Sequence, residues 1–146
     1  MKRGYFVNTG DMHYNFLKYL ELVLLEKPHV YNVRIAAAIV HKRDLLSIGF
    51  NSTKTHPLQA RHADHPDRVH MHAEVNAICG SFKSKQDLDG CTIYICRLKY
   101  ADSDKSSVIW GNVKPCDSCF KLIKDYNFKQ IIYTLDGVDR YCVQRM

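Results

Sequence analysis

The chain has 146 residues, of which 46% are hydrophobic and 25% charged. This length and composition predict one globular domain, over residues 1–146, with a buried core. No membrane-spanning segment is expected, because the longest apolar run, "IAAAIV" at 35–40, is far shorter than a transmembrane helix. The formal net charge of +6 suits an anionic partner such as a nucleotide or a nucleic acid.

The N-terminal segment, "MKRGYFVNTGD", begins with basic residues but has no apolar stretch after them. No signal peptide is therefore expected, and the expected location is the cytoplasm, where cysteines stay mostly reduced. Six cysteines in a reduced protein favour metal binding or thiol chemistry over a framework of disulfides.

The first half of the chain is predicted to contain one helix and two strands. Apolar residues repeat at helical spacing over 12–27, which predicts an amphipathic helix packed on the core. Two strands, at about 33–41 and 44–50, are separated by a short polar turn. A long polar loop at 51–70 follows them, and a loop of this length is often functional.

The second half continues the alternation of helices and strands. We expect a helix at 72–83, a strand at 91–98, a polar loop at 99–114, a helix at 116–126, a strand at 129–135 and a short edge strand within the tail, 138–146. Strands that alternate with helices predict an α/β layered domain with a mixed sheet.

Two motifs, at the starts of the second and third predicted helices, have the residue types of a metal site. His72 and Glu74 lie in "VHMHAEVNAI", and Cys116 and Cys119 lie in "KPCDSCFKLI" behind Pro115. The two cysteines are three residues apart, hence on one side of a helix, and the proline suits a helix start. The positive end of a helix dipole favours the thiolate form that binds metals.

His72, Cys116 and Cys119 together provide three ligands for a zinc ion, Zn²⁺, which leaves a fourth tetrahedral position for water. Glu74 would then stand beside the water without binding the metal. This arrangement, H-A-E followed by P-C-x-x-C, matches the signature of zinc-dependent deaminases. We therefore expect one catalytic zinc ion per chain and Glu74 as the catalytic residue.

Two other kinds of site are compatible with these motifs. A C-x-x-C pair can be a redox pair, but that function gives His72 and Glu74 no task. A closed structural zinc site needs a fourth protein ligand. The candidates for that ligand are Cys79, Cys91 and Cys96.

Through these motifs the sequence resembles the cytidine and deoxycytidylate deaminase superfamily, over roughly Arg34 to Thr134. "HAEVNAI" is similar to the deoxycytidylate deaminase form of the motif, and "CTIYIC" and "FKQIIYT" resemble the strands that flank the second motif. The resemblance implies an α/β fold, a three-layer α/β/α sandwich whose central mixed sheet has about five strands. It also implies hydrolytic deamination of a cytosine nucleotide, with deoxycytidylate (dCMP) as the first choice.

The resemblance further implies roles for individual residues. Glu74 would take a proton from the water that attacks C4 of cytosine, and would pass protons to N3 and to the leaving amine. Asn51, which follows "IGF", matches the asparagine that holds the sugar hydroxyl, although an asparagine after a strand also forms turns. The backbone near Ala73 and Cys116, with Pro115 beside it, would orient the pyrimidine.

The departures from the family pattern lie on the substrate side. Lys114 replaces the serine or glutamate that usually precedes the proline, and the segment before it is longer than in many relatives. The 51–70 loop is either a solvated surface loop or a functional one that shapes the pocket, holds a second metal ion or binds a phosphate, for which Lys54 and Arg61 are the candidates. The histidines of this loop, which would hold a second metal ion, are His56, His62, His65 and His70.

Two alternatives to a nucleotide deaminase remain. One is a deaminase of cytosine or adenine within RNA or single-stranded DNA, for which Trp110 or Tyr100 would stack on a base. Those two aromatic residues are expected rather to anchor their loop or a subunit contact. The other alternative is a zinc-stabilised binding module without catalysis, which leaves Glu74 unexplained. We also expect a homo-oligomer and no membrane partner.

Overall fold

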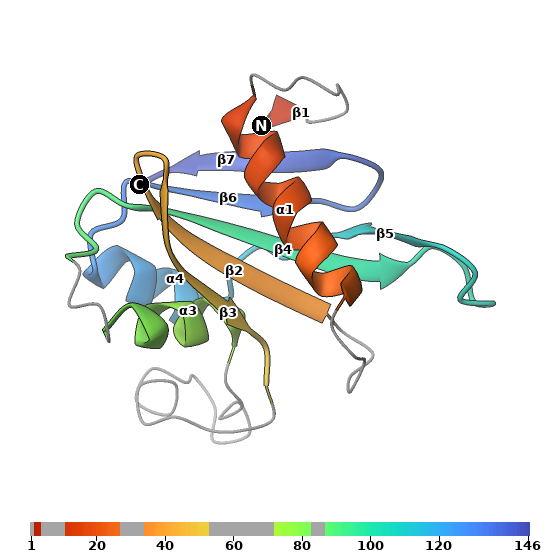
Figure 1. Cartoon of the computed structure of the whole chain (residues 1–146), viewed down its shortest axis with the longest axis horizontal. Helices are drawn as coiled ribbons and strands as arrows, with labels where there is room; N and C mark the ends of the chain where they lie inside the picture. Colours follow the sequence, from red (N-terminus) through yellow and green to blue (C-terminus); the bar gives the residue numbers. More distant parts are fainter. Residues whose placement is uncertain (1, 4–10, 27–33, 53–71, 83–86) are drawn as a thin grey trace.

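The structure is a computed structural model, and it describes residues 2–3, 11–26, 34–52, 72–82 and 87–146 (Figure 1). The helices in these ranges are α1 (Met12–Glu26), α3 (Ala73–Phe82) and α4 (Asp117–Asp125). The strands are β1 (Lys2–Arg3), β2 (Arg34–His41), β3 (Asp44–Phe50), β4 (Thr92–Tyr100), β5 (Val108–Gly111), β6 (Gln130–Thr134) and β7 (Arg140–Arg145). Every helix and strand predicted from the sequence is present, with bounds that differ by a few residues.

The strands form one mixed sheet in the order β1-β7-β6-β4-β2-β3, and β5 pairs with β4 outside this path. β4 and β6 are parallel, whereas the other paired strands are antiparallel. The predicted α/β fold with a mixed sheet is therefore confirmed. The described sheet has seven strands rather than about five, because the sequence pattern predicts neither β1 nor β5.

β5 lies inside the segment 99–114, for which the sequence predicts a loop. β4 runs on to Tyr100, and the chain then turns back so that Val108–Gly111 pairs with it antiparallel. The new strand has only four residues and follows a polar stretch, so it leaves no recognisable alternation in the sequence. The result is a hairpin, β4–β5, that leads directly into the second motif.

Trp110 holds this hairpin against α1. Its side chain is only 1% exposed, and its Nε1 donates a hydrogen bond to Oε1 of Glu21 at 2.8 Å. A buried indole whose N–H is satisfied is a structural anchor. Trp110 is therefore not available to stack on a base, in agreement with the expected anchoring role.

Helices cover both faces of the sheet and make the three predicted layers, with α1 on one face and α3 and α4 on the other (Figure 1). Successive residues of β4 point to opposite faces, as in any strand. Tyr94 and Cys96 belong to the core under α1, whereas Ile93 and Ile95 belong to the core under α3 and α4. That residues 1–146 form a single domain stays a prediction.

α3 packs very closely on β3 at Gly49. A Cβ atom on Gly49 would lie 2.2 Å from the backbone nitrogen of Ala77 and 2.5 Å from the carbonyl oxygen of Ala73. In addition, the side-chain oxygen of Asn76 accepts a hydrogen bond from the backbone N–H of Phe50 at 2.9 Å. These contacts fix the first turns of α3 against the end of β3, and this places the start of the helix.

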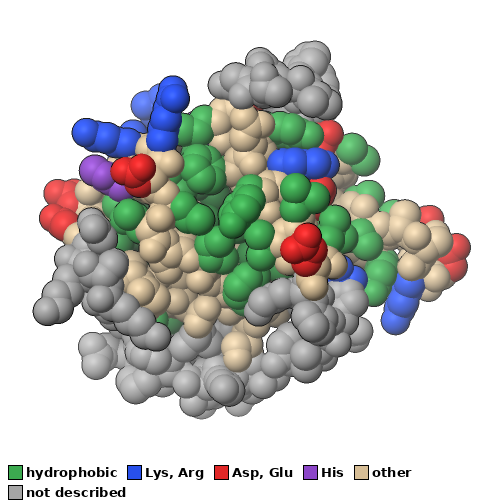
Figure 2. Space-filling model, viewed as in Figure 1, with side chains coloured by type: hydrophobic (Ala, Val, Ile, Leu, Met, Phe, Trp, Pro, Cys, Tyr) green, Lys and Arg blue, Asp and Glu red, His purple; other side chains and the backbone are tan. Residues whose placement is uncertain are grey.

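α1 also carries apolar side chains on its outer side. Tyr19, Leu22 and Leu25 are between 45% and 54% exposed, and Figure 2 shows hydrophobic side chains gathered on this face of the molecule. Exposed apolar side chains of this kind suit a protein contact, but the homo-oligomer expected from the sequence stays a prediction. None of the helices in the described ranges has the length and apolar character that a membrane span requires.

Candidate active site with a zinc centre

The starts of α3 and α4 meet beneath the sheet and bring together His72, Cys116 and Cys119. Nδ1 of His72 lies 3.2 Å from Sγ of Cys119 and 3.6 Å from Sγ of Cys116. The three potential ligand atoms all lie within 4.8 Å of one another. Residues from two distant motifs thus form one cluster, as the sequence predicts.

The local structure of the second motif differs slightly from the prediction. α4 begins at Asp117, so Cys116 is the N-cap residue rather than part of the helix, with φ −66° and ψ 166°. Sγ of Cys116 accepts a hydrogen bond from the backbone N–H of Cys119 at 3.5 Å. Pro115 is buried just before the cap. Both sulfur atoms therefore remain at the positive end of the α4 dipole.

The cluster fits a zinc ion. In a tetrahedral site with zinc–nitrogen distances of 2.0–2.1 Å and zinc–sulfur distances of 2.3 Å, ligand atoms are about 3.5–3.8 Å apart. The two distances from His72 to the cysteine sulfurs, 3.2 and 3.6 Å, are close to that spacing. Two thiolates and an imidazole are also ligands that zinc prefers.

The structure gives no fourth protein ligand in the part of the chain that it describes. The cluster consists of His72, Cys116 and Cys119, with no further histidine, cysteine or acidic ligand among the described residues. Cys96 lies in the core under α1, on the other face of the sheet, and Sγ of Cys91 instead faces the carbonyl of Asp87 at 3.7 Å. A three-ligand site that leaves one position open is typical of catalytic zinc.

The two thiols have opposite pKa shifts. A hydrogen bond from the Cys119 thiol is the largest cause that lowers the pKa of Cys116, to about 3, with His72 and Ser118 contributing further hydrogen bonds. The same contact, together with burial and the negative charge of Glu74, raises the pKa of Cys119. The shifts favour the thiolate form of Cys116 before a metal binds, whereas Cys119 must release its proton when a metal binds.

Glu74 lies in the first turn of α3, only 5% exposed, and lines the same pocket as His72 and Cys116. Burial raises the pKa of its carboxyl group, and a backbone hydrogen bond and the neighbouring His72 oppose this in part. A carboxyl group whose pKa is raised in a pocket can both accept and hold a proton. The position suits proton transfer next to the metal ligands.

The pocket beside the cluster has a volume of about 380 Å³. Small-molecule sites usually measure about 300–1,000 Å³. The pocket lies between the end of β3, the start of α3 and the segment that leads into α4. Its lining residues are Ile35, Asn51, His72, Ala73, Glu74, Arg97, Asn112, Val113, Lys114 and Cys116.

Two of the substrate residues expected from the sequence, Asn51 and Ala73, line this pocket, but Pro115 does not. Oδ1 of Asn51 accepts a hydrogen bond from the backbone N–H of Ile35 at 3.1 Å, so the residue also joins the ends of β2 and β3. This bond joins two strands rather than forming a turn, and contact of Asn51 with the sugar stays a prediction. Lys54, Arg61 and the four loop histidines fall in the range 53–71, outside the described residues.

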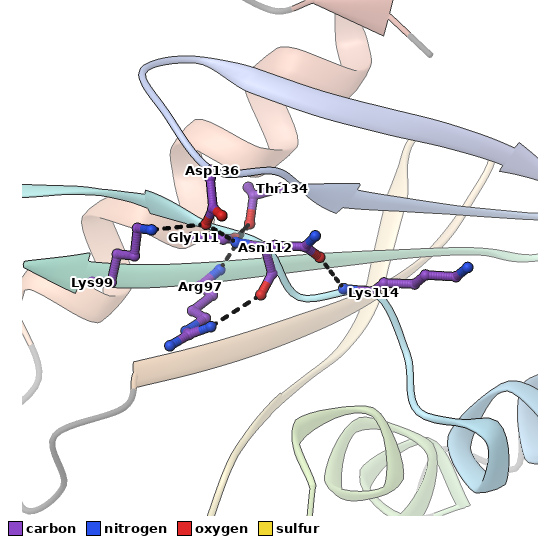
Figure 3. A network of polar contacts seen from close by, with 7 residues as sticks. All are labelled: Arg97, Lys99, Gly111, Asn112, Lys114, Thr134 and Asp136. Carbon is purple, nitrogen blue, oxygen red and sulfur yellow. Dashed lines mark hydrogen bonds and ion pairs between the residues drawn. The ribbon is translucent and has the colours of Figure 1, made fainter. Parts of the chain in front are cut away.

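Sequence reasoning missed the pocket wall made by β4 and the segment after β5. Arg97, Asn112 and Lys114 belong to it (Figure 3). Lys114 was visible only as a departure from the family pattern. A signal for Arg97 does exist in the strand alternation, since it follows Ile93 and Ile95 on the same face of β4. A charged residue that continues a buried apolar face is a candidate for a site.

A model of the cytidine and deoxycytidylate deaminase zinc-binding region matches residues 13–135 of the chain. No curated protein sequence matches the chain significantly. Among solved structures, the dCMP deaminase of cyanophage S-TIM5 in apo form is similar, with a TM-score of 0.58 and 22% identity over 90% of each chain.

The S-TIM5 enzyme in complex with dCMP and dUMP gives a TM-score of 0.57 and 20% identity, over 88% of this chain and 84% of that chain. The cytidine deaminase from Burkholderia pseudomallei gives a TM-score of 0.57 and 15% identity, over 91% of each chain. These similarities show the same fold. Because the family model covers most of the sequence, the chain belongs to the cytidine and deoxycytidylate deaminase family and is a zinc-dependent deaminase.

Proposed function

We propose that the enzyme converts a cytosine nucleotide to the uracil nucleotide by hydrolysis and releases ammonia, with dCMP as its substrate. The observation that carries this proposal is the cluster of His72, Cys116 and Cys119 beside the buried carboxyl of Glu74 in one pocket. A zinc ion held by the three ligands would supply the Lewis acidity that makes water nucleophilic near neutral pH.

Glu74 carries the protons in this proposal. Its carboxylate accepts a proton from the water whose oxygen bonds to C4 of cytosine, and then donates a proton to N3. A second proton passes through the same carboxyl group to the amino group, the C4–N bond breaks, and ammonia leaves. One buried carboxyl group that acts first as base and then as acid suits a raised pKa.

The remaining pocket residues would hold the substrate. We propose that Asn51, which lines the pocket, contacts the sugar and that the backbone at Ala73 orients the pyrimidine. Pro115 is buried behind Cys116 and would act by positioning that ligand. Lys54 and Arg61 stay candidates for contact with a phosphate.

Three observations support a single nucleotide as the substrate. The motif "HAEVNAI" resembles the deoxycytidylate deaminase form, and a cyanophage dCMP deaminase of the same fold has been solved with dCMP and dUMP. The pocket, at about 380 Å³, also has the size of a small-molecule site. A small-molecule nucleotide is therefore the proposed partner.

A deaminase of cytosine or adenine within a polynucleotide is the second candidate, and one feature favours it. The ring of Tyr100 lies 5.9 Å from the guanidinium carbon of Arg34 and 5.6 Å from Nζ of Lys105. Such a basic and aromatic cluster suits contact with a nucleic acid strand. Tyr100 and Lys105 belong to the β4–β5 hairpin, whereas Arg34 begins β2 and is adjacent in sequence to the pocket residue Ile35.

A substrate panel tests the proposal. The zinc-loaded protein would be incubated with deoxycytidine, dCMP, cytidine monophosphate and cytosine- or adenine-containing oligonucleotides, and the deaminated products separated by chromatography. We expect dCMP to react faster than deoxycytidine, and oligonucleotides to react little. Rapid reaction of oligonucleotides with an inert dCMP would favour the second candidate, and no deamination of any substrate would contradict both.

A further inference from the structure

We propose that Arg97 forms an anion subsite that recognises the 5′-phosphate of the nucleotide substrate. The inference rests on the proposed function and identifies a specificity-determining residue within the same pocket. Arg97 and Lys114 both line the pocket that contains His72 and Glu74. Arg97 lies outside both zinc motifs, whereas Lys114 is the first residue of the second one.

The structure holds the guanidinium group of Arg97 in a defined position. Arg97 lies on β4, opposite Ile35 of β2 and Gly111 of β5 in the strand register. Its Nη1 donates a hydrogen bond to the carbonyl oxygen of Asn112 at 3.1 Å (Figure 3). A positioned guanidinium group loses less conformational freedom when it binds a ligand.

The carbonyl that receives this bond is itself fixed. The backbone N–H of Asn112 donates to Oδ1 of Asp136 at 2.9 Å, and the side-chain oxygen of Asn112 accepts from the backbone N–H of Lys114 at 3.0 Å. These bonds tie the segment after β5 to Asp136 and to the backbone of Lys114 (Figure 3). The arginine and the lysine of the pocket wall are therefore supported by the same short segment.

Gly111 provides the space for the arginine side chain. A Cβ atom at this position would lie 3.1 Å from Cδ and 3.3 Å from Nε of Arg97, which is tighter than ordinary contact. A larger residue opposite Arg97 on β5 would therefore push the Arg97 side chain out of its present position by a few tenths of an ångström.

Arg97 has no ion-pair partner in the described part of the chain, although the carboxylate of Asp136 lies near enough to interact with its charge. No carboxylate forms an ion pair with it among the described residues, and its Nε is a buried donor that has no hydrogen-bond partner there. Lys99, two residues along the same face, behaves differently, since its Nζ lies 2.9 Å from Oδ1 of Asp136. A positioned but unpaired guanidinium group is suited to a phosphate or a carboxylate.

The location within the pocket points to a phosphate. The base must lie at the starts of α3 and α4, where Glu74 and the metal ligands are. Arg97 and Lys114 lie on the separate wall formed by β4 and the segment after β5. In a nucleotide the phosphate is joined to the base only through the sugar, so a ligand held at both walls presents its phosphate to the arginine. Glu74 is the sole acidic residue of the described lining, and Asp136 lies behind the wall, bonded to the backbone of Asn112.

Substitution of Arg97 tests the subsite. Arg97→Gln removes the charge at similar length, Arg97→Lys keeps the charge without the planar fork, and Lys99→Gln is the control on the same face of β4. Lys99 does not line the pocket, and its ion pair is partly exposed, so its loss should have little effect. Calorimetry with the zinc-loaded proteins would measure the Kd of dUMP and of deoxyuridine, which differ only in the phosphate.

We expect Arg97→Gln to raise the Kd of dUMP by about 10- to 100-fold, the range for a lost hydrogen bond between charged groups. The Kd of deoxyuridine should stay within about twofold, Arg97→Lys should be intermediate, and Lys99→Gln should match the wild type. If Arg97→Gln does not fold, as judged by circular dichroism and zinc content, Arg97→Lys alone must show the selective loss.

Other outcomes would overturn the inference. If Arg97→Gln raised the Kd of dUMP and of deoxyuridine equally, or raised neither, Arg97 would not be the residue that binds the phosphate. If Arg97→Gln weakened only the binding of oligonucleotides, and that binding depended steeply on salt, the arginine would contact a phosphate of a nucleic acid strand instead. The proposed function is tested separately by the wild-type enzyme, since it fails if dCMP is not deaminated.

Discussion

The sulfur of Cys116 accepts a hydrogen bond from the backbone N–H of Cys119 at 3.5 Å, so one zinc ligand also caps the helix that carries another. The metal site and the start of α4 therefore depend on the same atom. Because capping needs any good acceptor whereas zinc needs a thiolate, the two roles can be separated by substitution.

Cys116→Ser keeps an N-cap acceptor, and Cys116→Ala removes it. Both variants should lose their zinc, as measured by metal analysis of the purified proteins. In the presence of a chelator, Cys116→Ala should have a free energy of unfolding about 0.5–2 kcal/mol lower than Cys116→Ser, because it lacks the cap. Urea unfolding curves measure this difference, and coincident curves would show that the cap does not stabilise α4.

Substitution of Glu74 by glutamine should separate catalysis from metal binding. The change removes the proton carrier but leaves all three zinc ligands, so turnover should fall by at least about 100-fold while zinc content stays near one ion per chain. Steady-state kinetics with dCMP and metal analysis measure the two quantities. Glu26→Gln, at an exposed position of α1, is the control. Unchanged turnover in Glu74→Gln would mean that another group carries the protons.

Removal of the metal should abolish deamination reversibly. After dialysis against a chelator, one equivalent of Zn²⁺ should restore activity, whereas Mg²⁺ should not, because two thiolates and an imidazole are poor ligands for a hard cation. Titration of the apo protein with each ion, followed by the deamination assay, tests this. Full recovery with Mg²⁺ would argue against the ligand set proposed here.

Gly49→Ala should destabilise the fold, because its methyl group would lie 2.2 Å from the backbone nitrogen of Ala77, which cannot move independently of α3. Overpacking of this kind costs about 1–3 kcal/mol or more. Gly80→Ala is the matched control, since its methyl group would meet only the side chain of Ser47, with the hydroxyl oxygen at 2.7 Å. Urea unfolding should show a large loss for the first variant only, and similar losses for both would contradict the close packing.

The sequence was sufficient to predict the zinc ligands and the order of the main helices and strands. His72, Cys116 and Cys119 stand at helix starts whose signals are local, namely a proline, a run of helical periodicity and the spacing of the thiols. The alternation of helices and strands is likewise a local pattern. Such features need no knowledge of which strands pair.

The pocket wall made by β4 and the segment after β5 could not be predicted in the same way. Arg97 lies opposite Gly111 and bonds to the carbonyl of Asn112, and both contacts depend on β5, a strand with only four residues. Short strands are formed by the partner they pair with more than by their own sequence. Asn51 shows a related limit, because its bond to the backbone of Ile35 depends on the pairing of β2 with β3.

The position of the cluster has a consequence for folding as well as for chemistry. His72 and Cys116 are 44 residues apart in the chain, yet their ligand atoms lie 3.6 Å from each other. An ion that binds both closes a loop of that length, much as a disulfide would, and a cross-link of this size restricts the unfolded chain by about 4 kcal/mol in the chain-entropy model. The same ion that activates water would then tether α3 to α4. Depletion of zinc should therefore make α3 and α4 more sensitive to proteolysis, in addition to stopping the reaction.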